Sequence, residues 1–440
     1  MVDEPVWEIP VHSPKTAHSK KSKKSSSRAE GDGSTVVADA GLLPWYPSGL
    51  TSEPLDSSTL ELGIRTPWGR IWGWDYSEAL DASWWREPQG SWWGVWPKNV
   101  DSVRVVAHTQ NKIIVALGED FIAHIYPLQT GSDVSTLVRY KPWGEILKEE
   151  RVILPIGGLQ NDNGDQLCMF PYHEIHTPQE AALNLQNRNQ LHALGGAVGR
   201  LHSALKQEAT PNTEWRWNAR LKAIEGTLKT TTLWRAPHTK HVQGLPPFHI
   251  SLDGILWDED VTLVPQPRPL VDDLLCESER MPAIATLANL EQTIALRGGF
   301  SESVPRVSFY AGWEVKTPPT WGGRFLRTLK GGVWIWRYEA ILLELARARA
   351  FKQPEAESMC TGWLNDVSRI QAKLGVLRMT NLGAKTSLML FLISLGTIFF
   401  AGGPFTDSTG GIGRMMLATV VLFLAVALYR YTEQNIPEPY

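Results

Sequence analysis

Two apolar runs near the C-terminus constrain the fold of this chain more than any other feature. Thr386–Phe405 and Met415–Tyr429 flank a short polar, glycine-rich turn. The first run is long enough to cross a hydrocarbon core of about 30 Å, which needs roughly 20 helical residues, and the second needs its flanking residues as well. Neither run has the polar face of a surface helix. We therefore predict a transmembrane helical hairpin over residues 386–431 and disfavour the alternative, a buried hairpin in a soluble protein.

Basic residues beside the runs predict the orientation of this hairpin. Four of them precede the first run, namely Arg369, Lys373, Arg378 and Lys385, whereas the connecting segment carries only Asp407 and Arg414. Positive residues stay on the cytoplasmic side of a membrane. The first residues also lack the basic and apolar regions of a secretory signal. We expect a multi-pass membrane protein with two C-terminal spans and a cytoplasmic N-terminal domain.

Cysteine usage and net charge narrow the functional classes. Cys168, Cys276 and Cys360 have neither metal nor redox spacing, which suits a reducing compartment. His173-Glu174-Ile175-His176 lacks the spacing of a zinc helix, so we predict no metal site from a motif of this kind. The net charge of −3 gives no general attraction to nucleic acid, and no nucleic-acid partner is expected.

The segment before residue 99 has two parts of different composition. Residues 1–40 are polar, with a basic stretch at Lys20–Arg28, and we expect them to be disordered. They form either a solvated tail or a polybasic segment attracted to anionic lipid. Residues 41–98 are a tryptophan-rich extension that holds Trp45, Trp68, Trp72, Trp74, Trp84, Trp85, Trp92, Trp93 and Trp96. Three interpretations are open for them: a compact core, a platform for stacking sugars or bases, or contact with lipid headgroups.

Residues 99–176 predict an antiparallel sheet of five strands. The β-branched or alternating runs are Ser102–His108, Lys112–Leu117, Phe121–Tyr126, Val152–Ile156 and Gln166–Phe170. Turn residues separate them, and a charged helix around Gly144–Arg151 follows the third strand.

Residues 177–352 are mainly helical in pattern. Thr177 begins one helix, and Asn189–Leu205 and Trp334–Phe351 show apolar residues at helical spacing. A strand over Val261–Val264 and a helix from Arg268 lie between them. An amphipathic linker helix over residues 355–378 then connects this α+β region to the hairpin.

Three motifs in this order resemble the aminoglycoside phosphotransferase and maltokinase branch of the protein-kinase-like fold. They are Gly199-Arg200-Leu201-His202, then Phe248-His249 followed by Ile255-Leu256-Trp257-Asp258, then Arg268-Pro269-Leu270-Val271-Asp272-Asp273-Leu274. The resemblance covers roughly residues 100–350. It implies a bilobal domain, with the sheet at 99–176 as N-lobe and a mainly helical C-lobe over 177–352.

The resemblance fails at the positions that carry catalysis. Ser251 stands where the family keeps its base aspartate, and Thr262–Gln266 ends without the aspartate that holds the metal. The third strand, Ile122–Tyr126, has no lysine for the phosphates, and no glycine-rich phosphate loop precedes it. Phosphoryl transfer needs anionic ligands for magnesium and a group that orients the nucleophile. The degenerate motifs therefore indicate a pseudokinase.

If the chain is a kinase nevertheless, the resemblance implies a displaced site that uses ATP and magnesium. Asp253 is then the base beside His249 in the loop, with Asp258 or Asp272 as metal ligand. His124 or Lys141 lies at the phosphates, and Glu149 or Glu150 is their partner from the helix. The alternative for these acids is structural: Asp253-Gly254 forms a turn, and Asp272-Asp273 cap the next helix.

The sequence as a whole predicts a membrane-anchored pseudokinase with a binding or regulatory role. Its expected partners are the bilayer, a protein at the membrane, and a nucleotide or sugar ligand held between the lobes. Two alternatives stay open. One is a divergent ATP-dependent phosphotransferase for a sugar or lipid-linked substrate, and the other is a structural membrane component that uses its tryptophans as an interface.

Overall fold

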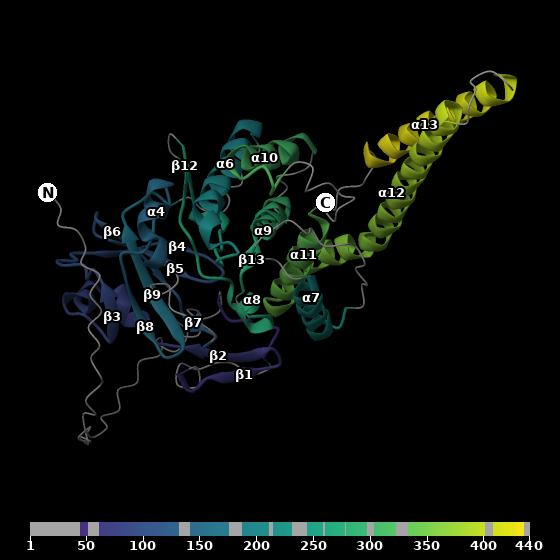
Figure 1. The fold of residues 1–440 in the computed structure, drawn as a ribbon. Helices are drawn as coiled ribbons and strands as arrows, with labels where there is room; N and C mark the ends of the chain where they lie inside the picture. Colours follow the sequence, from purple (N-terminus) through teal and green to yellow (C-terminus); the bar gives the residue numbers. More distant parts are fainter. Residues whose placement is uncertain are drawn as a thin grey trace, which may run out of the picture.

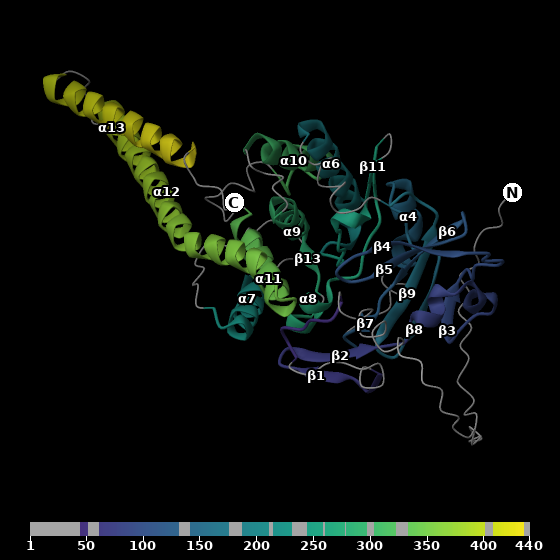
Figure 2. The same cartoon turned by 180° about the vertical axis from the view of Figure 1, so that it is seen from behind.

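The computed structural model describes residues 45–51, 61–131, 141–175, 187–210, 214–230, 244–257, 260–277, 279–296, 303–322, 333–400 and 408–434. Within these ranges the chain forms a sheet lobe, a helical lobe and a two-helix arm that projects away from both (Figure 1, and Figure 2 from behind). The expected tail at 1–40, the helix start at Thr177 and Asp258 lie outside the described residues. The predicted α+β architecture of two lobes followed by a helical hairpin is confirmed.

The sheet lobe is built on an antiparallel sheet of six strands in the order β3-β8-β9-β6-β5-β4. These strands are β3 (Ser91–Gly94), β4 (Val103–His108), β5 (Ile113–Leu117), β6 (Phe121–Ile125), β8 (Gly157–Asn161) and β9 (Gly164–Pro171). Helix α4 (Gly144–Glu149) follows β6 and β7, as expected. Four of the five predicted strands coincide with β4, β5, β6 and β9. The sixth strand, β3, comes from the tryptophan-rich extension.

The strand predicted over Val152–Ile156 was wrong, because pairing begins at Gly157. Glycine is a poor strand former, so the sequence pattern favoured the β-branched residues before it. In the structure a Cβ added to Gly158 would lie 2.7 Å from the carbonyl oxygen of Leu167 and 2.8 Å from the ring of Trp93. The bare backbone thus lets β3 and its indole approach. Val152 instead forms an isolated parallel bridge with Leu263 of the helical lobe.

The tryptophan-rich extension packs into the sheet lobe. Besides β3, it supplies β1 (Ile64–Thr66) and β2 (Gly69–Gly73), which form a second sheet with β7 (Leu128–Gln129). All nine of its tryptophans are buried or half-buried. Trp85 is fully buried and donates its indole N–H to the carbonyl oxygen of Ala79 at 2.9 Å. The structure thus favours the compact-core interpretation over a stacking platform or a headgroup contact.

The helical lobe contains α6 (Arg188–Ala204), α7 (Glu214–Leu228), α8 (Leu270–Leu275), α9 (Ala283–Leu296), α10 (Ser303–Lys316) and α11 (Trp334–Ala350). Two short strand pairs join them, β10 (Gly244–Leu245) with β13 (Met281–Pro282) and β11 (Ile255–Trp257) with β12 (Val261–Leu263). Helix α11 is the buried centre of the lobe, with apolar side chains around most of its circumference. Helices α6 and α10 pack closely, because a side chain at Gly195 or Gly312 would overlap the backbone of the other helix.

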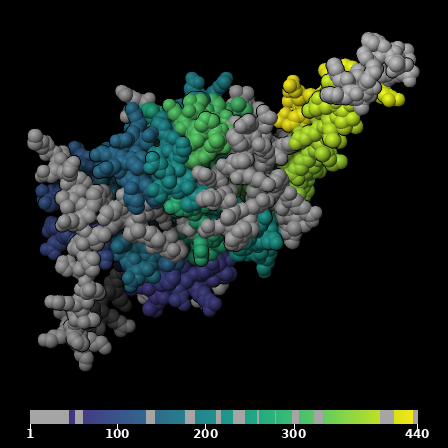
Figure 3. All heavy atoms as spheres, viewed as in Figure 1, coloured from purple at the N-terminus to yellow at the C-terminus, as the bar shows by residue number. Residues whose placement is uncertain are grey.

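The arm consists of α12 (Pro354–Phe400) and α13 (Ser408–Gln434). The expected linker helix and the first apolar run form the single helix α12. Its first part packs on the helical lobe through the buried side chains of Cys360, Leu364, Val367, Ile370 and Leu374. Beyond that point α12 pairs with α13, and the hydroxyl oxygens of Thr380 and Thr432 lie 3.1 Å apart. Figure 3 shows the arm standing clear of the lobes.

Both arm helices are long and apolar enough to cross a membrane, over Pro354–Gly396 and Gly413–Gln434. Their large apolar side chains face outward instead of into a core, with Leu390 58% and Leu424 61% exposed. A soluble protein rarely exposes an apolar surface of this extent. Length, composition and exposure therefore agree with the predicted spans, while the cytoplasmic orientation stays a prediction.

Candidate functional site

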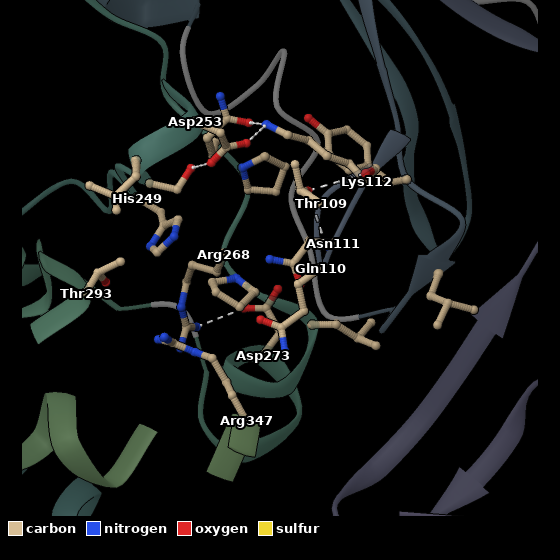
Figure 4. Close-up of a pocket in the computed structure, with 18 of the residues that line it drawn as sticks. Thr109, Gln110, Asn111, Lys112, His249, Asp253, Arg268, Asp273, Thr293 and Arg347 are labelled. Atoms are coloured by element: carbon tan, nitrogen blue, oxygen red, sulfur yellow. Dashed lines mark hydrogen bonds and ion pairs between the residues drawn. The ribbon is translucent and has the colours of Figure 1, made fainter. Parts of the chain in front are cut away.

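A cavity of about 620 Å³ lies between the two lobes (Figure 4). The sheet lobe contributes the turn between β4 and β5, the residues around β7, and the turn between β8 and β9. The helical lobe contributes the loops at 249–253 and 266–270 and the first turns of α12. The lining includes many uncharged hydrogen-bonding side chains, namely Thr109, Gln110, Asn111, Gln129, Thr130, Asn163, Ser251, Gln266, Thr293 and Gln353. Charged side chains also line it, namely Lys112, Asp165, Asp253, Arg268, Asp273, Glu344, Arg347 and Glu355.

Lys112 bridges the two lobes at one wall of this cavity. It immediately precedes β5, whose five residues are all buried, and its own side chain is only 4% exposed. Its ammonium lies 2.8 Å from Oδ2 of Asp253 and donates to Oε1 of Gln266. It also lies 3.5 Å from Nδ1 of His124 on β6. Figure 4 shows the lysine reaching across to Asp253.

Burial and charge together set the protonation states around Lys112. Burial would raise the pKa of Asp253, but the Lys112 ammonium and the hydrogen bonds from Lys112 and Ser251 hold it below its usual range. Burial lowers the pKa of Lys112, and the charge of Asp253 opposes this shift. Burial and the nearby Lys112 charge also keep the pKa of His124 well below its usual value. His124 is thus neutral and can accept a hydrogen bond from the ammonium through Nδ1.

His249 stands at the start of the loop that ends at Asp253. Its carbonyl oxygen accepts the backbone N–H of Gln266 at 2.9 Å, which joins the two loops that line the cavity. Burial, assisted by the charge of Arg347, lowers the pKa of the His249 ring to about 4. The ring is therefore neutral at physiological pH. Asp253 lies in a short 3₁₀ turn, Leu252–Gly254, and accepts the hydroxyl of Ser251, as the turn interpretation expected.

The two acids of α8 are ion-paired. Both oxygens of Asp272 accept hydrogen bonds at 2.8 Å from Arg347 of α11, and Asp272 is 3% exposed. Burial would raise the pKa of Asp272, but Arg347 outweighs burial and holds it low. Asp273 pairs with Arg268 at 2.9 Å. The N-cap of α8 is Pro269 and no side chain caps it by a hydrogen bond, so the expected capping role is wrong.

The structure brings most, but not all, of the predicted site residues together. His249 and Asp253 line the cavity, and His124 is buried beside Lys112. Glu149 is exposed near the end of α4 and is not part of the lining. Its alternative, Glu150, is half-buried directly after α4. The backbone of Lys141 begins a 3₁₀ turn, and its side chain lies outside the described structure, as does Asp258.

Several lining residues escaped the sequence argument, above all Lys112, Arg268 and Arg347. A charged residue directly before an apolar strand ordinarily marks only where the strand begins. The sequence pattern therefore did not indicate that Lys112 belongs to a site. Arg347 offered a better signal, because it lies in a helix whose many apolar residues predict burial, although four other charged residues share that helix. A buried arginine requires a buried acid as its partner, although the sequence does not say which one.

The described residues do not fit the magnesium that the kinase resemblance implies. The carboxylate of Asp253 is bound by an ammonium, and so is the amide of Gln266, which ends the segment where the resemblance leads one to expect a metal-holding aspartate. Asp272 is bound on both oxygens by Arg347. Within the described ranges, no group of three or more His, Cys, Asp or Glu side chains is placed to hold a metal ion.

No family model matches the sequence, and no curated protein matches it. Among solved structures, a glucosamine kinase is similar, with 14% identity over 79% of this chain and 100% of that one, at a TM-score of 0.45. The GDP and kanamycin complex of an APH(2") enzyme has 11% identity over 61% and 93%, at 0.38. A GDP complex of a mutant aminoglycoside phosphotransferase has 8% identity over 61% and 91%, at 0.35. Likenesses at these TM-scores carry no argument about the function of this chain.

Proposed function

We propose that this chain is a membrane-anchored, kinase-like protein whose interlobe cavity binds an uncharged polar molecule without transferring phosphate. The observation that carries the proposal is the pairing of three acids, in or beside the cavity lining, with cations of the chain itself. Asp253 is paired with Lys112, Asp272 with Arg347 and Asp273 with Arg268. Phosphoryl transfer needs carboxylates that are free to bind magnesium and to orient a nucleophile.

The internal pairing of the cations at the cavity also supports an uncharged ligand. Lys112, Arg268 and Arg347 each use donors on a carboxylate, so a phosphate would compete with an internal partner at each cation. The surrounding lining offers amides and hydroxyls instead. Such groups recognise hydroxyl or amide groups, which both donate and accept hydrogen bonds.

Gln129 gives this ligand class a specific contact. The residue is 5% exposed and lines the cavity, and its Nε2 donates to the carbonyl oxygen of Asp165 at 3.1 Å. Its Oε1 has no hydrogen-bond partner within the described structure. A buried acceptor left unpaired costs about 1–3 kcal/mol. A hydroxyl or N–H of the ligand would recover this cost once the amide oxygen turns toward the cavity.

In this proposal the arm holds the cavity near a membrane. Its two apolar helices support anchoring in the bilayer, and the basic residues before the first span support a cytoplasmic body. A ligand-binding body held at a membrane suits a regulatory role, in which ligand occupancy is communicated to a protein partner there. Both the orientation and the partner belong to the proposal.

Thermal unfolding of the full chain in detergent, followed by tryptophan fluorescence, tests the ligand class. N-acetylglucosamine and myo-inositol are uncharged probes, and glucosamine is a cationic counterpart of the first. We expect an uncharged probe to raise the Tm, glucosamine to raise it less, and Gln129→Leu to abolish the effect. Gln160→Leu is the matched control, because Gln160 also has an unpaired buried Oε1 but does not line the cavity.

Phosphate release from ATP with magnesium tests the absence of phosphoryl transfer. We expect none above background from the full chain. Turnover that falls on Asp253→Asn would contradict the proposal and support a divergent phosphotransferase. If no uncharged probe changes the Tm while the chain still floats with liposomes, the ligand class is wrong and a structural role at the membrane is favoured.

A further inference from the structure

The surroundings of the Lys112 ammonium are those of a bound cation. One carboxylate oxygen of Asp253, the amide oxygen of Gln266 and the neutral Nδ1 of His124 converge on Nζ. The lysine comes from the sheet lobe, whereas Asp253 and Gln266 come from two different loops of the helical lobe. A lysine ammonium has three N–H donors, which equals the number of these acceptors.

We propose that the Lys112 ammonium is a built-in substitute for a divalent ion, so that this cavity closes and binds its ligand without metal. The inference deepens the proposed function and rests on it only for the existence of a ligand. In the sequence resemblance, Gln266 stands where the metal-holding acid is expected, and the amide that replaces this acid now contacts the ammonium.

Charge decides between an ammonium and a divalent ion at this position. The three acceptors carry a single negative charge, on Asp253, and one ammonium balances it. A divalent ion would leave an excess positive charge in a buried site, and magnesium also demands near-octahedral oxygen ligands. Changing Gln266 to a carboxylate reverses the balance, because two acids would then face a single ammonium.

Lys112 also links the two lobes to each other. Its contacts with Asp253 and Gln266 tie the β4–β5 turn to the loops at 249–253 and 266–270, which together line the cavity. A metal ion bridging the same groups would have the same mechanical effect. The fixed ammonium provides it without depending on the concentration of an ion.

Electron paramagnetic resonance of Mn²⁺, titrated with the full chain in detergent, tests the substitution directly. We expect the wild-type chain to show no Mn²⁺ binding that is lost on Asp253→Asn. The double variant Lys112→Met, Gln266→Asp should bind Mn²⁺ about tenfold or more tightly, because affinity rises with the number of ligand charges. Lys148→Met, which removes an exposed lysine of α4, is the matched control and should leave binding unchanged.

Two outcomes would overturn the inference. One is stoichiometric Mn²⁺ binding by the wild-type chain that is lost on Asp253→Asn, a measurement that needs no redesigned variant. The other is a folded double variant with no gain in Mn²⁺ affinity. Neither readout involves the neutral ligand, so a failed probe screen would refute the proposed function and leave the metal result standing.

Discussion

The Arg347–Asp272 pair allows the energetic role of the buried charges to be measured. The pair joins α11 to α8 through two hydrogen bonds of 2.8 Å, and the side chains are 11% and 5% exposed. Removing one member of a buried ion pair leaves an uncompensated charge and costs about 3–5 kcal/mol. We therefore expect Arg347→Met to lower the free energy of unfolding by an amount in this range. Asp272→Asn should lower it by less, because Arg347 keeps its ion pair with Glu344.

The pair should also give a specific pH dependence. In the wild-type chain the pKa of Asp272 is depressed, so its stabilising contribution is complete above the unfolded value of about 3.9 and is lost only as pH falls further. In Arg347→Met, burial raises the pKa of Asp272 above its unfolded value. Protonation then favours the folded state, and the deficit of this variant should be smaller at pH 5 than at pH 7.5.

Urea unfolding of the full chain in detergent, followed by tryptophan fluorescence, provides the measurement. The double variant should lose less than the sum of the single losses, with a coupling energy of at least about 1.5 kcal/mol. Arg369→Met is the matched control, because its pair with Asp366 is 62% and 46% exposed, and its loss should stay within about 0.5 kcal/mol. Additive losses, or an Arg347→Met deficit that does not change with pH, would refute the reasoning.

Three further predictions concern packing, titration and the membrane. Gly195→Ala should destabilise the α6–α10 contact by about 1–3 kcal/mol. Gly226→Ala, at an exposed position of α7, should stabilise the protein by up to about 1 kcal/mol, and urea unfolding measures both changes. His202 accepts the indole N–H of Trp313 at 2.9 Å, and burial lowers the pKa of His202 to about 3. Because the unfolded chain then binds a proton more readily than the folded one, the Tm of the wild-type chain should fall between pH 6.5 and 4. His202→Asn should reduce this pH dependence. Val420→Arg would put a charge in the middle of the second predicted span, at a cost of about 2.5–3.5 kcal/mol. We expect this variant to be extracted from membranes by alkaline carbonate. Retention in the membrane pellet equal to that of the wild-type chain would contradict the predicted span.

The secondary structure was predictable where local pattern and tertiary environment agree. The apolar runs of β5 and β6 and the helical spacing of α6 and α11 gave these elements nearly correct bounds. The prediction failed at β8, where Gly157 leaves room for the carbonyl oxygen of Val95 and Gly158 leaves room for the ring of Trp93. No local pattern contains that requirement.

The candidate site was predictable only in part, for a related reason. The loop pattern located His249 and Asp253, and both line the cavity. It did not identify Lys112, whose partner Gln266 lies 154 residues away in sequence. Charge complementarity between distant segments becomes visible only after folding has brought them together.

The continuity of α12 has a consequence for how the cavity is filled. Met359, near its beginning, lines the cavity, and Thr386, further along the same helix, begins the apolar run. Measured along the helix axis, roughly 40 Å separates the two, at 1.5 Å per residue. With the arm inserted in a bilayer as proposed, such a separation would keep the mouth of the cavity in the aqueous phase. A ligand would then arrive by diffusion through water and not by lateral transfer out of the lipid.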